Sequence, residues 1–150
     1  MNPLTIQPIG IVKTISPEPE GDDWSKVLSE LHIDEAFASG LEGLGDWSHI
    51  VVIYSMHGSQ FSPEEHLVRS PGLDLPEVGI FAQRARFHPN TIGLTAVRLM
   101  EINDTVIKVK GLDAIDKTPI LDIKPYAPIY DGVQDPLVPA WFIQLMQGNV

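Results

Sequence analysis

Cysteine is absent from this 150-residue chain, which excludes disulfide bonds, thiolate zinc sites and cysteine nucleophiles. The five histidines show no spacing typical of metal ligands, so we expect no metal site. Gly-x-Gly-x-x-Gly, Walker, Gly-x-Ser-x-Gly and His-Glu-x-x-His motifs are also missing. A Rossmann-fold enzyme is therefore unsupported.

Long hydrophobic runs are missing as well. Ile50–Tyr54 is among the longest, far short of the ~20 apolar residues that span a bilayer. Residues 1–7 have no basic segment ahead of an apolar core, so they do not resemble a signal peptide. From these features we expect a soluble, cytoplasmic protein without a membrane anchor.

Basic residues are scarce: 10 Lys and Arg stand against 20 Asp and Glu, giving a net charge of −10. Because phosphate recognition depends on Lys and Arg, such a surface on average repels nucleic acid. A local basic patch can overcome this repulsion, and Arg84, Arg86 and Lys124 are candidates to form one.

Most of the secondary structure that the sequence predicts consists of short strands. Alternating or β-branched patterns predict strands at residues 6–13, 27–33, 50–56, 92–102, 105–109 and 120–123, with Asn103-Asp104 as a hairpin turn. Short helices are predicted after the N-cap Asp34 and over residues 139–146, with an exposed loop at 16–23 and a long loop at 58–76. This pattern predicts a mostly β fold: a small β-barrel with short peripheral helices, forming a single domain over residues 1–150.

Residues 81–95 are the most informative stretch, Phe-Ala-Gln-Arg-Ala-Arg-Phe-His-Pro-Asn-Thr-Ile-Gly-Leu-Thr. Two of the four arginines, Arg84 and Arg86, stand two residues apart and share a face if the backbone is extended. Such a pair can clamp a carboxylate or phosphate through bidentate contacts. Pairing with the chain's own carboxylates is the alternative.

A second polar segment covers residues 113–126. Asp122 lies there between Leu121 and Ile123, and a buried carboxylate needs a partner. A structural salt bridge, for which Lys124 is available, explains Asp122 as well as catalysis does. His49 and His57 flank the strand at 50–56; we interpret His49 as bonded to a nearby loop and leave His57 open between site and solvent. His32 and His66 are interpreted as surface residues.

These segments together resemble the TsaA/TrmO family, also called YaeB-like. The stretches that carry the resemblance cover nearly the whole chain: residues 8–12, 40–53, 69–71, 79–86, 89–90, 92–94 and 118–126. The resemblance implies a small β-barrel that binds S-adenosyl-L-methionine and forms a homodimer with the site near the subunit interface. It further implies methylation of N6 of threonylcarbamoyl-adenosine 37 in tRNA.

The resemblance also implies roles for individual residues. The methyl donor would be bound by Phe81, Ala82, Ile92, Gly93, Leu94, Thr118 and Pro119. The acceptor would face Arg84, Arg86, His88 and Asn90, and the catalytic group would be Asp122, Lys124 and Tyr126.

The chain departs from the family pattern at several positions. It has His88-Pro-Asn-Thr-Ile-Gly where Arg-Pro-Asn-Pro-Ile-Gly is usual, and Lys117 where a glycine usually precedes Thr-Pro. The C-terminal extension of the longer family members is also missing. A small-molecule or peptide acceptor, and a non-catalytic S-adenosylmethionine-binding module, therefore stay open beside tRNA methylation.

The segment at 139–146 carries a bulky apolar face of Trp141, Phe142, Leu145 and Met146. This face predicts either a homodimer interface or packing against the chain's own barrel.

Overall fold

The computed structural model describes residues 2–17, 19, 21 and 23–148. The strands are β1 (Gly10–Thr14), β2 (Leu28–Ile33), β3 (His49–Ser55), β4 (Val68–Arg69), β5 (Val78–Gly79), β6 (Ile92–Asn103), β7 (Val106–Lys110) and β8 (Pro119–Pro125). The helices are α1 (Pro63–His66), α2 (Pro128–Asp131) and α3 (Ala140–Met146). Short 3₁₀ turns cover Trp24–Lys26, Glu35–Leu41, Leu44–Asp46 and Ile80–Ala82.

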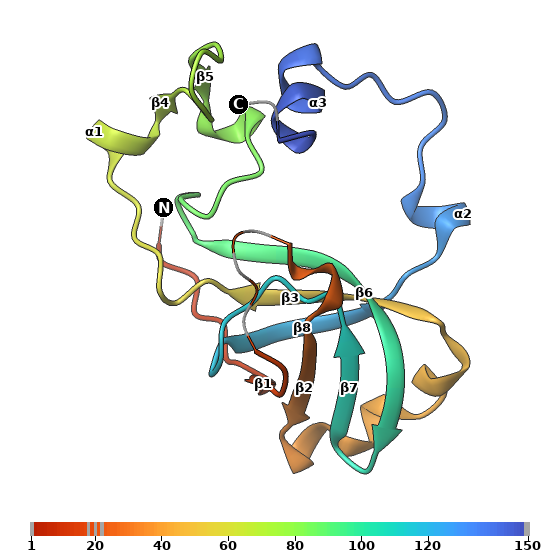
Figure 1. Cartoon of the computed structure of the whole chain (residues 1–150). Coiled ribbons are helices and arrows are strands. Elements are labelled where there is room, and N and C mark those ends of the chain that lie inside the picture. The colour runs from red at the N-terminus through yellow and green to blue at the C-terminus, as the bar shows by residue number, and fades with distance from the viewer. Residues whose placement is uncertain (1, 18, 20, 22, 149–150) are drawn as a thin grey trace. The chain divides into compact units, whose positions relative to one another are not determined.

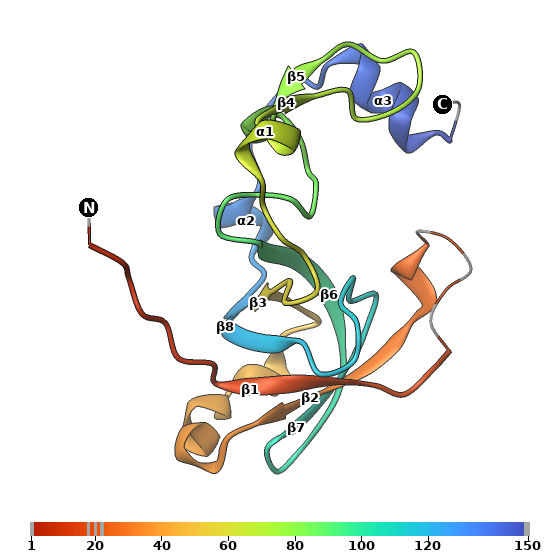
Figure 2. The ribbon, with the colours of Figure 1, turned by 90° about the vertical axis from the view of Figure 1, so that its left-hand side faces the viewer.

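Strands β1, β2, β7, β6, β3 and β8 follow one another, in that order, around a closed barrel (Figure 1). Each strand pairs antiparallel with its neighbours, and β1 closes the barrel against β8 through the pairs Gly10–Ile120 and Ile11–Pro119. Figure 2 shows β1, β2 and β7 as neighbours in this wall. Closure removes exposed strand edges, as expected for a small β-barrel.

The core of the barrel comes from alternate residues of its strands. In β2, Ser29, Leu31 and Ile33 are buried while the residues between them are partly exposed, as the sequence pattern predicted. The core cluster consists of Val12, Leu31, Ile33, Ile50, Val52, Tyr54, Val97, Ile107, Val109, Leu112, Ala114 and Ile120. The opposite set of side chains therefore lies on the outside of the wall.

Some boundaries differ from those predicted. The first strand begins at Gly10 rather than residue 6, because Pro8 has no N–H to donate to a ladder. The hairpin turn lies at Asp104-Thr105, one residue later than predicted, since Asn103 still pairs with Val106 and Asp104 takes the turn angle φ 51°. The predicted loop at 16–23 falls partly outside the described residues.

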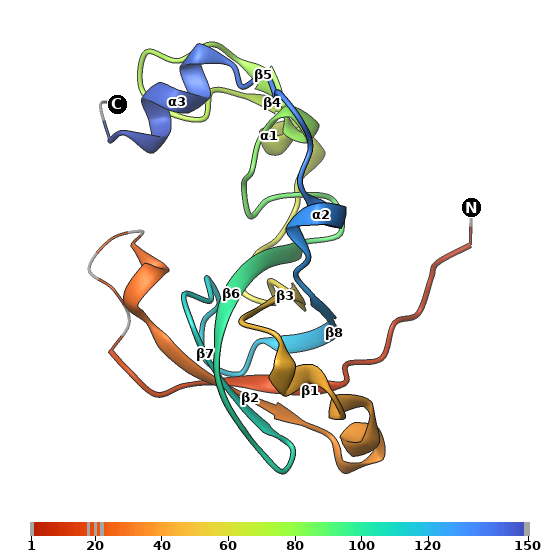
Figure 3. The ribbon, with the colours of Figure 1, turned by 90° about the vertical axis from the view of Figure 1, so that its right-hand side faces the viewer.

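The chain separates into two compact units, and the second comprises residues 58–91 and 128–150. The predicted long loop at 58–76 was wrong in part, because α1 and β4 lie within it and β4 pairs with β5. Figure 3 shows α1, the β4–β5 pair and α3 in this unit. Asp34 caps its 3₁₀ turn in the barrel unit as predicted, its side chain accepting a hydrogen bond from Ala36 N at 2.9 Å.

Across the described ranges, no helix is long and apolar enough to cross a membrane. The same residues contain no group of three or more histidine and carboxylate side chains arranged to hold a metal ion.

Candidate functional site

The outer face of the barrel brings together several of the predicted site residues. Ile50, Val52 and Tyr54 of β3 point into the core, so Val51 and Ile53 face outward. Ile53 pairs with Leu94 of β6 on one side and with Asp122 of β8 on the other. Val51 pairs in the same way with Ala96 and Lys124. Leu94, Asp122 and Lys124 thus share one outer surface, which we call the β6–β3–β8 face.

A β-bulge in β8 determines this arrangement. Tyr54 pairs with Ile120 and the adjacent Ile53 pairs with Asp122, so Leu121 is an extra residue in the ladder. Ile120 points into the core, and strict alternation would send Asp122 inward as well. The extra residue instead turns Asp122 and Lys124 outward.

Asp122 and Lys124 form an ion pair, with Nζ 2.8 Å from Oδ2. The second carboxylate oxygen, Oδ1, accepts a hydrogen bond from Ile123 N at 2.8 Å. The hydrogen bond and the negative charge of Asp122 raise the pKa of the Lys124 ammonium above its ordinary value. The salt bridge considered for Asp122 is therefore present, whereas its expected burial was wrong, because 46% of its side chain is exposed.

Gly93 allows a tyrosine to fill one end of the barrel. Gly93 pairs with Tyr54, and a Cβ added at Gly93 would lie 2.3 Å from the Tyr54 ring. The Tyr54 hydroxyl lies 3.0 Å from Thr95 Oγ1 and donates a hydrogen bond to the carbonyl oxygen of Asp113. The predicted donor residue Gly93 therefore serves the packing of Tyr54, a residue that sequence reasoning missed.

Other predicted donor residues lie near this end of the barrel. Thr118 is buried, and its Oγ1 lies 3.5 Å from Nδ1 of the exposed His57. Pro119 pairs with Ile11 at the start of β8. Ile92 and Leu94 stand on either side of Gly93 with their side chains exposed on the outer face.

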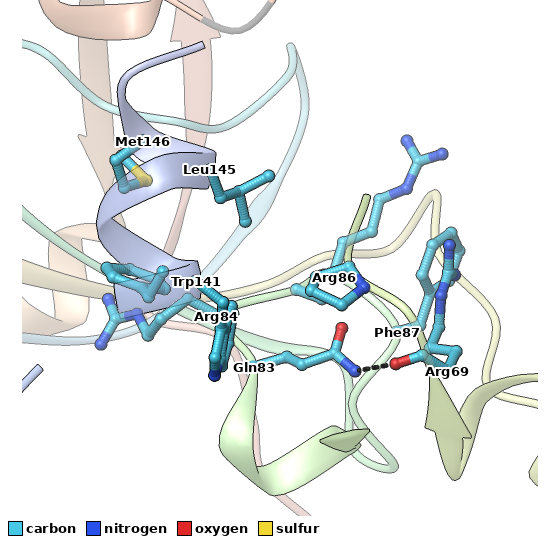
Figure 4. A pocket seen from close by; sticks show the side chains of 11 residues that line it. Arg69, Gln83, Arg84, Arg86, Phe87, Trp141, Leu145 and Met146 are labelled. Atoms are coloured by element: carbon cyan, nitrogen blue, oxygen red, sulfur yellow. Dashed lines mark hydrogen bonds between the residues drawn. The ribbon is translucent and has the colours of Figure 1, made fainter. Parts of the chain in front are cut away.

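The arginine-bearing segment belongs to the second unit and is held by a buried glutamine. Gln83 Nε2 donates hydrogen bonds to the carbonyl oxygens of Arg69 and Val78, both at 3.0 Å, and Figure 4 shows the first. Phe81 and Ala82 lie in the 3₁₀ turn just before it, and both are exposed. Gln83 thus anchors the turn that presents the arginines.

A cavity of about 250 Å³ lies beside this segment (Figure 4). Arg84 and Arg86, both predicted to bind the acceptor, line it together with Arg69, Pro71, Gln83, Ala85, Phe87, Trp141, Phe142, Leu145 and Met146. The bulky face of α3 therefore lines a cavity of its own unit, an arrangement that neither prediction for the terminal helix included. Three guanidinium-bearing side chains and an aromatic wall suit a ligand with both an anionic and an apolar part.

Phe87 organises the cationic side of the cavity. The His66 ring stacks on it with centroids 4.4 Å apart, and the guanidinium carbons of Arg86 and Arg69 lie 4.8 and 5.4 Å from its centre. His66 is buried rather than on the surface as expected, and its Nδ1 accepts a hydrogen bond from Ser62 N. Phe87 and His66 lie 21 positions apart in the sequence, so the sequence pattern did not reveal their contact.

The remaining predicted residues lie apart from the cavity lining. The His88 ring bonds its own segment, with Nε2 2.9 Å from the carbonyl oxygen of Gln83, and Asn90 is exposed. Tyr126 follows β8, and its backbone N–H donates to the carbonyl of His49. His49 itself bonds the adjacent Ser48 hydroxyl through Nδ1 at 2.9 Å, as the loop interpretation predicted.

The chain is similar to known proteins in both its sequence and its fold. The family model of the tRNA-methyltransferase O N-terminal domain matches residues 16–132. An S-adenosyl-L-methionine-binding protein of Archaeoglobus fulgidus is 36% identical over 134 residues, which cover 87% of this chain and 94% of that protein. A tRNA (adenine(37)-N6)-methyltransferase of Escherichia coli is 34% identical over 113 residues, which cover 71% of this chain and 48% of that enzyme.

Among solved structures, TrmO from P. aeruginosa superimposes with a TM-score of 0.75 at 28% identity, covering 93% of this chain and 62% of that one. A further A. fulgidus relative, a probable S-adenosyl-L-methionine-binding protein, is 35% identical over 143 residues. This chain spans only 38% of the length of that relative.

Proposed function

Because the chain belongs to the family of the tRNA-methyltransferase O N-terminal domain, we propose that it is an S-adenosyl-L-methionine-dependent tRNA methyltransferase. Its target is N6 of adenosine 37 bearing a threonylcarbamoyl group. The family match over residues 16–132 is the observation that carries this proposal. Relatives named for S-adenosyl-L-methionine binding and for adenine-37 methylation support the donor and the acceptor.

The β6–β3–β8 face suits the methyl donor. Exposed apolar side chains at Ile92 and Leu94 offer a surface for an adenine ring, and Asp122 offers negative charge on the same face for a sulfonium cation. Thr118 and Pro119, at the start of β8, complete the proposed donor-binding residues of the barrel unit. Phe81 and Ala82, also predicted to bind the donor, are exposed in the second unit.

The cavity beside Arg84 and Arg86 suits the acceptor. A threonylcarbamoyl group ends in a carboxylate, which a guanidinium can bind through two parallel hydrogen bonds. Trp141 and Phe142 line the same cavity and can stack on a base. His88 and Asn90, which lie farther along the segment, are proposed to contact the acceptor outside the cavity.

When bound, S-adenosyl-L-methionine would supply an electrophilic methyl group to N6 as its carbon–sulfur bond breaks, and N6 would lose a proton. We propose that Asp122, which lies on the outer face of the barrel, orients the N6–H and accepts that proton. We do not assign Lys124 as the base, because its hydrogen bond and ion pair with Asp122 raise the pKa of its ammonium and so favour the protonated form. Its ion pair holds the carboxylate in place, and Tyr126 is proposed to orient the acceptor.

The function is tested by incubating the full chain with methyl-labelled S-adenosyl-L-methionine and tRNA that carries or lacks the threonylcarbamoyl group. Label is expected at N6 of adenosine 37 only in the modified tRNA. Label in a small-molecule or peptide fraction instead would transfer the proposal to that acceptor. Donor binding without any transfer would identify a non-catalytic binding module.

The role of Asp122 is tested by D122N, which removes the proton acceptor while keeping the size of the side chain. We expect kcat to fall about 10²- to 10⁴-fold. D104N is the matched control, since Asp104 lies in the exposed β6–β7 turn. Unchanged kcat in D122N would remove Asp122 from the mechanism.

We further propose that residues 1–150 act as one functional domain, in the cytoplasm, as a homodimer. Apolar side chains left exposed in the second unit support the dimer: Ile129, Tyr130, Val133, Leu137, Ile143 and Met146. Light scattering at micromolar concentration is expected to give twice the 16.5 kDa chain mass. A monomeric mass would refute the dimer.

A further inference from the structure

The outside of the barrel carries two neighbouring cross-strand rows of charged residues. In the first row, Lys13 of β1 pairs with Glu30 of β2, Glu30 with Lys108 of β7, and Lys108 with Glu101 of β6. The signs alternate, so each charge stands opposite its complement. We call this the alternating row. It needs no partner from outside the chain.

The second row differs in sign. Lys110 of β7 pairs with Arg98 of β6, and Arg98 pairs with His49 of β3. These side chains face outward, since their neighbours Val109, Val97 and Ile50 are buried in the core. Every residue of this row is a cation or can become one. We call it the cationic row.

The cationic row is unfavourable for the chain on its own. Like charges directly opposite each other on adjacent strands destabilise a sheet. Within the described part of the chain, neither Lys110 nor Arg98 forms an ion pair, in contrast to pairs such as Lys124–Asp122. This happens in a protein with twice as many acidic as basic residues, where acidic partners are plentiful.

We propose that the cationic row, Lys110–Arg98–His49, binds the sugar–phosphate backbone of the RNA substrate. Phosphate oxygens would neutralise Lys110 and Arg98, and the planar guanidinium of Arg98 can engage a phosphate through two hydrogen bonds. On a surface that otherwise repels a polyanion, this row supplies local attraction and orients the RNA without reading its sequence. The inference rests on the proposed function for the identity of the polyanion.

The test compares two double variants of the full chain that remove the same positive charge. R98A/K110A takes two cations from the cationic row, and K13A/K108A takes two from the alternating row. Fluorescence anisotropy measures the Kd for tRNA at several salt concentrations. R98A/K110A is expected to bind about tenfold more weakly and to lower the slope of log K against log salt by about 1.5 to 2. K13A/K108A is expected to change both quantities much less.

Two further measurements separate a phosphate-binding row from general effects. Thermal unfolding of R98A/K110A is expected at or above the wild-type temperature, because the variant removes repulsion between like charges. In the methylation assay its KM for tRNA is expected to rise about tenfold with kcat unchanged, as for a lost binding contact.

Three results would overturn the inference: unchanged tRNA affinity in R98A/K110A, equal loss in both double variants, or no tRNA binding by the wild type at low salt. Weakened binding in R98A/K110A alone, without methyl transfer by any of the proteins, would instead support the row and refute the proposed function.

Discussion

Two residues with left-handed backbone angles lie beside the predicted binding segments. Thr91 has φ 47° and Lys117 has φ 65°, a region that costs non-glycine residues about 1–2 kcal/mol. These are two of the positions where the chain departs from the pattern of the family it resembles. Proline, usual at the first position, cannot adopt φ 47° because its ring holds φ near −65°. Thr91 thus permits a backbone path that proline would forbid.

Lys117 gives a stability prediction, because a glycine would adopt its backbone angle without strain. K117G is expected to raise the free energy of unfolding by about 1 kcal/mol, measured by urea denaturation. G111A is the reciprocal change, since Gly111 has φ 92°, and it is expected to lower the free energy by a similar amount. A loss of stability in K117G would show that the lysine side chain contributes more than its strained backbone costs.

Gly93 gives a second prediction at the residue scale. In G93A the new methyl group would lie 2.3 Å from the buried Tyr54 ring, so the ring must shift. We expect a loss of about 1–3 kcal/mol in the free energy of unfolding. G40A is the control, since a Cβ there meets nothing within 4 Å. Equal stability of the two variants would contradict the tight contact at Tyr54.

At the scale of elements, the terminal helix α3 lines the proposed acceptor cavity through one side only. W141A is expected to raise the KM for modified tRNA about tenfold, because one aromatic stacking partner is worth roughly 1–3 kcal/mol. Gln144 lies on the same helix, is exposed and does not line the cavity, so Q144A should leave KM unchanged. Similar KM values for both variants would show that the base binds elsewhere.

Elements with clear alternation were predictable from the sequence. The pattern of β2 identified both the strand and its buried face, since a period of two leaves little choice of orientation. The pairing of β4 with β5 was not predictable, because strands of two residues are too short to show a period. The bulge at Leu121 was missed for a similar reason: an extra residue is visible only against the partner strand.

The candidate site was predictable only in part. Residues 81–95 were identified by their unusual concentration of arginines in an acidic chain. The cavity also needs Arg69 and the face of α3, and sequence spacing cannot show that such distant segments come together. His66 follows two glutamates in the sequence, which suggested the surface, whereas its ring is buried against Phe87.

At the scale of the whole molecule, buried apolar side chains are distributed unevenly between the two units. The core cluster lies entirely within the barrel unit, whereas the buried apolar side chains described for the second unit are Leu75 and Ile80. Regions with few buried apolar contacts open at lower free energy than the core does. The second unit, which carries the proposed acceptor cavity, should therefore open more readily than the barrel.

Native-state hydrogen exchange tests this difference. The amides of Val52 and Ile107 in the barrel are expected to exchange about a hundredfold more slowly than the hydrogen-bonded amides of Ile80 and Gln83. Adding tRNA should slow exchange in the second unit. Equal protection in both units would show that the chain unfolds as one cooperative block.

The extra residue in β8 has a consequence for how this chain tolerates insertions and deletions. Loss of Leu121 would place Asp122 directly after Ile120, and strict alternation would then keep Asp122 and Lys124 on the outer face and Ile123 toward the core. Loss of Ile123 would instead place Lys124 directly after the outward Asp122 and turn its ammonium toward the apolar interior. Deletion of the Leu121 codon should therefore be tolerated far better than deletion of the Ile123 codon.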